Sequence, residues 1–108
     1  MSESNNLTRE ILNFLYKNGI FCWRVSTTGI FDRAKGIYRP GGKRGVSDIL
    51  AVLPPTGRLL AVEVKIGKDK LSPEQEGFLA NVVHAGGLSF VAKDLDSFKE
   101  WWYHVIKI

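Results

Sequence analysis

The chain has 108 residues, of which 44% are hydrophobic and 24% charged, as in one folded domain rather than a disordered or fibrous chain. Its single cysteine, Cys22, excludes an intrachain disulfide and a cysteine zinc site. Apolar runs stay far below the roughly 18 residues that cross a bilayer, and the polar residues 1–6 are unlike a secretory signal. We therefore expect one cytoplasmic domain over residues 1–108, without a membrane partner.

Positive charge is concentrated in one segment of the chain. The formal net charge is +4, whereas residues 24–44 hold six basic residues and one acid, a net +5 that leaves −1 elsewhere. The segment also carries two aromatic residues and five glycines and prolines, a combination suited to contact with phosphates and bases. A solvated loop is the alternative. The candidate nucleic-acid contacts are Arg24, Arg33, Lys35, Arg39, Lys43 and Arg44.

The first half of the chain predicts a helix, two strands and a long loop. Asn5 or Asn6 can cap a helix over about residues 7–18, whose apolar side chains recur on one stripe. The β-forming residues 20–25 predict a strand. The basic segment follows as a loop, and the apolar run 47–53 predicts a strand that ends at the turn residues 54–57.

The second half predicts a returning strand, a helix, a strand and a helix. Residues 58–66 complete a hairpin. Ser72, Pro73 and Gln75 form a capping box that starts a helix, which ends before residues 86–87. Residues 88–92 predict a strand, and Asp96 begins a last helix. The order α-β-β-β-α-β-α predicts an α/β fold, with a mixed β-sheet flanked by helices.

Charged residues gather at one end of the predicted hairpin. Asp48 begins one strand, and Glu63 and Lys65 lie near the end of its partner, so the turn brings them to one edge. Residues two apart on a strand share a face at about 6.6 Å spacing, so Glu63 and Lys65 point the same way. Two adjacent carboxylates favour a divalent cation, and oxygen ligands favour Mg²⁺ or Mn²⁺ over zinc. A lysine beside such an ion can serve a water and a phosphate.

An ordinary ion pair between Glu63 and Lys65, with Asp48 as a turn residue, is the alternative interpretation. The context favours a site, because the flanking strand residues look buried on both faces, where an unpaired charge is costly. Glu10 borders the apolar stripe of the first helix and is a further candidate acid at this edge.

Three sequence blocks carry a family resemblance. Residues 45–49 (GVSDI), 61–65 (AVEVK) and 71–75 (LSPEQ) resemble the signature blocks of the VRR-NUC domain, the virus-type replication-repair nuclease group of the PD-(D/E)XK superfamily. The resemblance extends from the first helix through Val91 and implies a restriction-endonuclease-like core that hydrolyses phosphodiester bonds. Ser47 stands where the superfamily motif has a proline, which contributes backbone shape rather than a ligand.

The resemblance also implies roles for individual residues. Asp48, Glu63 and the carbonyl of Val64 would hold Mg²⁺ or Mn²⁺, and Lys65 would serve the attacking water. Gln75 would support the site, and Glu10 would match the acid of the first helix. Standalone members of this size resemble phage or bacterial proteins that dimerise and cut branched DNA. These features predict a metal-dependent homodimeric endonuclease for four-way (Holliday) junctions in DNA repair, acting in the cytoplasm of a bacterium or phage host.

Two other functions remain open from the sequence. The chain is alternatively a non-catalytic nucleic-acid-binding module on the same fold, or a nuclease for flaps, nicked duplex or a specific sequence. Trp101, Trp102 and Tyr103 suit either a dimer interface or, more simply, packing of the last helix on its own core. His84 and His104 are isolated, and no Ser-His-Asp arrangement is indicated.

Overall fold

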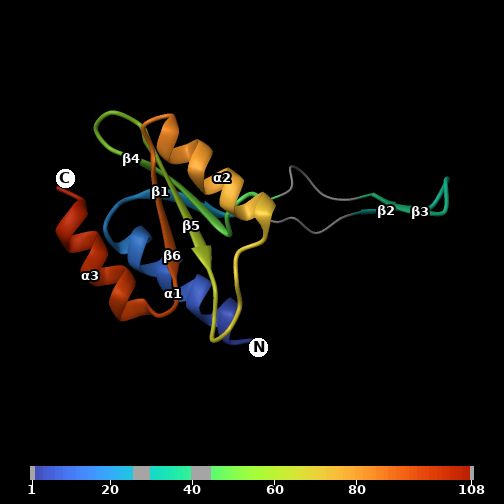
Figure 1. Cartoon of the computed structure of the whole chain (residues 1–108), viewed down its shortest axis with the longest axis horizontal. Coiled ribbons are helices and arrows are strands. Elements are labelled where there is room, and N and C mark those ends of the chain that lie inside the picture. Colours follow the sequence, from blue (N-terminus) through green and yellow to red (C-terminus); the bar gives the residue numbers. More distant parts are fainter. Residues whose placement is uncertain (1, 26–29, 40–44, 108) are drawn as a thin grey trace.

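The computed structural model of the chain describes residues 2–25, 30–39 and 45–107. Within these residues the chain forms three helices and six strands, five of the strands following one another between the first and second helices (Figure 1). In chain order they are α1 (Glu3–Lys17), β1 (Phe21–Arg24), β2 (Ile30–Asp32), β3 (Ile37–Arg39), β4 (Ile49–Leu53), β5 (Arg58–Val64), α2 (Pro73–His84), β6 (Leu88–Ala92) and α3 (Leu95–Val105).

The main sheet has four strands in the order β1-β4-β5-β6. The pairs β1/β4 and β4/β5 are antiparallel, whereas β5 and β6 run parallel and are joined through α2. This is the mixed sheet flanked by helices that the sequence predicts, and its elements follow the predicted order. None of the helices in the described ranges is long and apolar enough to span a membrane.

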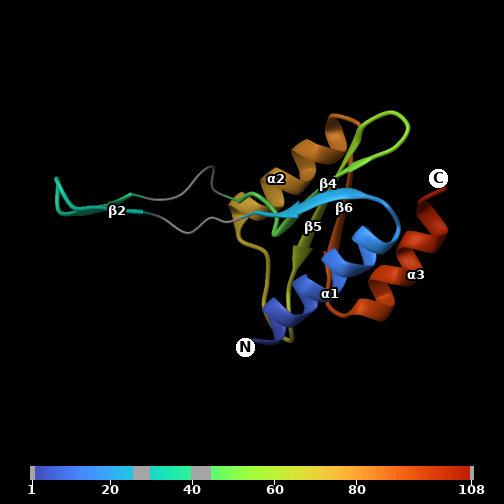
Figure 2. The same cartoon turned by 180° about the vertical axis from the view of Figure 1, so that it is seen from behind.

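Successive side chains of β5 pack into two separate layers, as strand alternation requires. Leu60 and Val62 belong to the larger core, which also contains Ile11 of α1 and Phe98 of α3. Ala61 lies on the opposite face and packs beneath α2. The helices α1 and α3 lie side by side in both views (Figures 1 and 2). Glu63, two residues after Ala61, therefore belongs to the face that α2 covers.

Two helix starts differ from the sequence prediction. α1 begins at Glu3, because the hydroxyl of Ser2 caps it by accepting a 3.1 Å hydrogen bond from the backbone N of Asn5. α3 begins at Leu95, where Asp94 is the cap and accepts from the backbone N of Ser97 at 2.7 Å. In both places several polar residues compete as caps. The helix extends to the earlier one, which lengthens α1 by about one turn and moves the start of α3 by one residue.

The predicted loop between β1 and β4 contains a second, two-stranded sheet. β2 and β3 pair antiparallel across the turn 33–36, where Gly36 adopts a positive φ of 65°. The hairpin extends to one side of the main sheet (Figure 1). The prediction of a plain loop was wrong here, because two three-residue β-forming runs around a glycine turn are already a hairpin pattern.

Candidate active site

Asp48 and Glu63 face each other at the open end of the β4–β5 hairpin. The register pairs Ile49 with Val62, so the next residues outward, Asp48 and Glu63, are opposite one another on the α2 face. Asp48 Oδ2 accepts a 2.7 Å hydrogen bond from the backbone N of Val64. This side-chain bond takes the place of a backbone hydrogen bond between β4 and β5. The pairing of these two strands therefore ends here, and β5 ends at Val64 rather than at the predicted Ile66. The bond also fixes the Asp48 carboxylate against β5.

Glu63 is a buried acid with one unsatisfied oxygen. Its side chain is only 2% exposed. Oε1 accepts a hydrogen bond from Gln75 Nε2 at 3.2 Å. Oε2 is buried and has no hydrogen-bond partner among the residues that the structure describes. Ionisation of Glu63 here would leave a buried carboxylate oxygen without a donor, which is strongly destabilising, so the ionised form favours a cation as its partner.

The electrostatics of Glu63 indicate the same requirement. Burial first, then a side-chain hydrogen bond with Asp48 and the negative charge of that neighbour, raise the pKa of Glu63 to about 8, while the ammonium of Lys65 acts in the opposite direction. Without a cation, Glu63 therefore holds its proton at neutral pH. A divalent ion between the two carboxyls would supply the missing positive charge and displace that proton.

Gln75 reaches Glu63 because the start of α2 holds it in place. Its side-chain Oε1 accepts from the backbone N of Ser72 at 2.9 Å, and its backbone N donates to Ser72 Oγ at 3.2 Å. This reciprocal capping box confirms the predicted start of α2 at Pro73. Because the cap uses the amide oxygen, the amide nitrogen is left to face the acid. One side chain thus both starts the helix and orients Glu63.

Gly45 joins the segment before Asp48 to the same helix turn. It has a positive φ of 80°, and a Cβ built there would lie 2.4 Å from the backbone oxygen of Glu74. Only glycine permits both the conformation and this approach. Sequence reasoning included Gly45 in a motif block without assigning it a role. Its close packing fixes the strand that carries Asp48 relative to the helix that carries Gln75.

Lys65 follows β5 directly and shares the face of Glu63. Its backbone N donates to the carbonyl oxygen of Ala92 at 2.9 Å, which continues the β5–β6 ladder past Val64. The side chain is half-buried. Its ammonium group, at the end of β5, is near enough to act on the charge of Glu63.

Ser47 is fully buried immediately before Asp48. Its hydroxyl has no hydrogen-bond partner within the described parts of the chain. Because no described residue hydrogen-bonds to this hydroxyl, an apolar side chain would lose no hydrogen bond here, in agreement with the proline that the superfamily motif has at this position.

The other predicted site residues lie apart from this cluster. Glu10 is exposed on α1, and no group of three or more His, Cys, Asp or Glu residues able to hold a metal occurs in the described ranges. Arg24 Nη2 donates to Asn5 Oδ1 on α1. Arg33 and Lys35 are exposed at the β2–β3 turn. The side chain of Arg39 and the whole of Lys43 and Arg44 lie outside what the structure describes.

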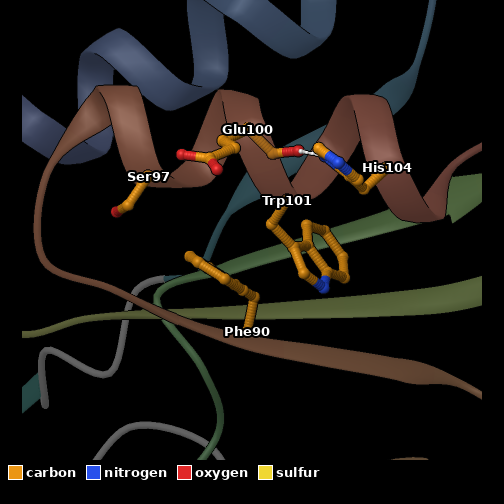
Figure 3. Close-up of a pocket in the computed structure, with 5 residues that line it drawn as sticks. All are labelled: Phe90, Ser97, Glu100, Trp101 and His104. Atoms are coloured by element: carbon orange, nitrogen blue, oxygen red, sulfur yellow. Dashed lines mark hydrogen bonds between the residues drawn. The ribbon is translucent and has the colours of Figure 1, made fainter.

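A groove of about 350 Å³ between β6 and α3 is a competing location for a site (Figure 3). It is lined by Ser97, Glu100 and His104, residue types that can form a catalytic triad. However, His104 Nδ1 contacts the backbone oxygen of Glu100 at 2.9 Å, and Ser97 Oγ donates to the backbone oxygen of Asp94 at 3.2 Å. These bonds tie each side chain to its own helix, so they form no nucleophile and base pair.

The aromatic residues of α3 serve mainly to pack the fold. Phe98 and Trp102 are buried in the larger core, and Trp101 stacks on Phe90 at 4.9 Å between ring centroids. Tyr103 remains exposed but contacts Phe14 edge to face at 5.9 Å. This is the simpler of the two uses expected for these residues.

Comparison with known proteins places the site within a recognised domain. The family model of the VRR-NUC domain matches residues 3–94, from the start of α1 to the cap of α3. The matched range includes Asp48, Glu63, Lys65 and Gln75. No curated protein and no solved structure matches the chain.

Proposed function

The chain belongs to the VRR-NUC domain family, whose members are DNA nucleases of the PD-(D/E)XK type, and from this premise we propose a divalent-metal-dependent endonuclease centred on Asp48 and Glu63. The observation that carries this proposal is the buried Glu63 Oε2, which has no hydrogen-bond partner within the described residues while its carboxyl faces Asp48. A structural ion pair would satisfy that oxygen. A metal site requires it to be available.

The donor set fits Mg²⁺ or Mn²⁺. Asp48, Glu63 and the carbonyl of Val64 would hold the ion, and these hard oxygen donors match the ligands that both ions prefer. Two carboxylates are enough, because Mg²⁺ usually keeps waters and substrate phosphate oxygens as its other ligands. When bound, the ion lowers the pKa of a water and neutralises charge on the phosphate.

The protein residues then divide the remaining work. Lys65 orients the attacking water and stabilises the negative charge that develops on the phosphate. Gln75 positions the Glu63 carboxylate through its amide nitrogen, and Val64 N positions Asp48. The attacking water gives one proton to the solvent as its oxygen forms a bond to phosphorus, the ester bond to one sugar oxygen breaks, and that oxygen takes a proton from the solvent to leave as a hydroxyl.

We propose four-way DNA junctions as the substrate and a homodimer as the active form, with residues 1–108 acting as one cytoplasmic domain in a bacterium or phage host. The basic segment 24–44 supports this, since Arg33 and Lys35 present positive charge on the exposed β2–β3 turn. Two copies related by a two-fold axis would match the symmetry of a junction. We assign Arg24, Arg39, Lys43 and Arg44 to the same contact surface.

The test compares end-labelled substrates of equal length: a four-way junction, a flap, a nicked duplex and a linear duplex. Purified protein is incubated with each in Mg²⁺, Mn²⁺ or EDTA. We expect paired symmetric nicks in the junction only when a divalent ion is present. Products from the flap alone would support the nuclease activity but change the proposed substrate from a four-way junction to a flap.

A non-catalytic binding module is the second candidate, favoured by Ser47 in place of the motif proline. It predicts a strongly salt-dependent mobility shift of the junction, with no product in any divalent metal.

A further inference from the structure

Two large aromatic side chains lie exposed together on the edge strand β1. Phe21 is 69% exposed and Trp23 is 39% exposed, and their ring centroids are 5.3 Å apart with a 42° angle between the planes. Cys22, between them, points into the core on the other face. Adjacent exposed aromatic rings on the free edge of a sheet are costly in water, so they mark a contact surface.

The register places Trp23, the nearer ring of the pair, beside the candidate active site, and Phe21 two residues farther along the strand. Trp23 pairs with Leu50, and the backbone N of Val25 donates to the carbonyl oxygen of Asp48 at 2.8 Å, which continues the same alignment. Trp23 is therefore a diagonal neighbour of Asp48 on the same sheet face, a relationship that corresponds to about 7–8 Å. α2 packs on β5 and β6, at the other side of this face, so it leaves the rings on β1 open.

The chemistry of the pair selects its ligand. The two rings offer flat apolar faces, and the strand segment Phe21–Trp23 carries no charge. A nucleobase has a matching π-face, and stacking on aromatic side chains tolerates any base. In a duplex the bases are stacked on one another, so only an unpaired or splayed base can reach such a surface. A phosphodiester held at Asp48 would bring its flanking nucleotide toward Trp23, the nearer of the two rings.

We propose that Phe21 and Trp23 form a stacking platform for an unpaired base next to the phosphodiester held at Asp48 and Glu63. This inference rests on the proposed function and adds the feature of the substrate that the site reads. The platform binds rather than reacts, so its loss weakens binding of substrates with an unpaired base near the cut. Fully paired duplex gains nothing from it.

The test measures binding in EDTA, so it does not depend on cleavage. The probe is a duplex with a short single-stranded gap that holds 2-aminopurine, whose fluorescence is quenched by stacking. We expect the wild-type chain to quench the probe on binding. Phe21→Ala combined with Trp23→Ala should bind roughly tenfold more weakly and lose the quenching, whereas Trp23→Phe should retain most of both. Tyr16→Ala is the matched control, because Tyr16 is a similarly exposed aromatic, 55%, on α1.

Three results would overturn the platform. The first is unchanged affinity and quenching in the double variant. The second is an equal loss of affinity for an ungapped duplex of the same length. The third is a dimeric wild-type chain that becomes a monomer in the double variant, as measured by sedimentation velocity. That result would assign this edge of the sheet to contact with a second copy of the chain. If the wild-type chain quenches the probe in EDTA but forms no product in Mg²⁺ or Mn²⁺, the result supports the stacking platform and contradicts only the proposed nuclease function.

Discussion

Gln75 Nε2 donates to Glu63 Oε1 at 3.2 Å while Gln75 Oε1 accepts from the backbone of Ser72 at 2.9 Å. The helix cap therefore fixes the direction of the amide nitrogen, and the amide nitrogen fixes one oxygen of the acid. The other oxygen of Glu63 has no hydrogen-bond partner in the part of the chain that the structure describes.

Gln75→Ala is expected to reduce cleavage through the loss of this positioning contact. Groups that orient metal ligands typically contribute about 10–100-fold in affinity or activity. Ser72→Ala is the matched control, because it removes a cap worth about 1 kcal/mol but leaves the Gln75 side chain in place. Steady-state cleavage and urea unfolding of both variants separate the effects. Equal loss of activity in the two variants would contradict the positioning role.

Metal binding should strengthen as the pH rises. The pKa of Glu63 is raised to about 8 in the metal-free protein, so below that pH the ion must displace a proton, and its affinity falls. Titration calorimetry with Mn²⁺ in buffers of different ionisation enthalpy should detect close to one proton released at pH 6.5. In Glu63→Gln this release should vanish. Proton release that persists in the variant would mean that another group is displaced.

The same pKa predicts the pH dependence of stability without metal. Because the pKa of Glu63 in the folded chain lies above its ordinary value of 4.5, the folded state holds the extra proton between the two values. In EDTA, the contribution of Glu63 to the free energy of unfolding should therefore be highest below pH 4.5 and should decrease as the pH rises to about 8. Glu63→Gln removes this contribution, so the difference between the two proteins should change over that interval in urea titrations. A constant difference would contradict the burial of Glu63 as an acid.

Gly45→Ala should be far more destabilising than the same change at another left-handed glycine. Gly67 also has a positive φ, 60°, but a Cβ there meets nothing within 4 Å. Gly67→Ala should cost about 1–2 kcal/mol from the backbone alone. Gly45→Ala adds a clash with the carbonyl of Glu74, worth roughly 1–3 kcal/mol more. Urea midpoints measure both variants, and equal costs would show that Gly45 does not pack against α2.

Much of this arrangement is local and was predictable from sequence. The capping box of Ser72 and Gln75 defines the start of α2, and strand β6 covers the predicted residues 88–92. Alternation along a hairpin with a fixed turn is enough to place Asp48 near Glu63. These features depend on neighbours in the sequence or on one short turn.

The contacts that give these residues their places depend on segments distant in the sequence. The amide nitrogen of Gln75 meets Glu63 only because α2 crosses β5, and Gly45 matters only because Glu74 lies against it. Likewise, Arg24 meets Asn5 because β1 returns beside α1. The basic segment suggested a loop because charge was the dominant signal there, although it contains the β2–β3 hairpin.

Lys65→Ala should lower the rate of cleavage more than it lowers DNA binding. Its charge is assigned to the transition state, where loss of one such group typically reduces the rate on the order of 100-fold. Lys68→Ala, an exposed lysine three residues later, is the control for general charge. Single-turnover rates and filter binding give the two quantities. Losses of the same size in both would make Lys65 a phosphate anchor.

The most direct test of the central claim is cleavage by Asp48→Ala beside Asp69→Ala, which removes an exposed acid from the loop after β5. Each variant is incubated with the end-labelled junction in Mg²⁺, in Mn²⁺ and in EDTA, and junction binding is measured in parallel. We expect Asp69→Ala to cut as the wild type does in either metal, and Asp48→Ala to bind the junction without cutting it. Metal-dependent nicking by Asp48→Ala at the wild-type rate would contradict the assignment of the active site.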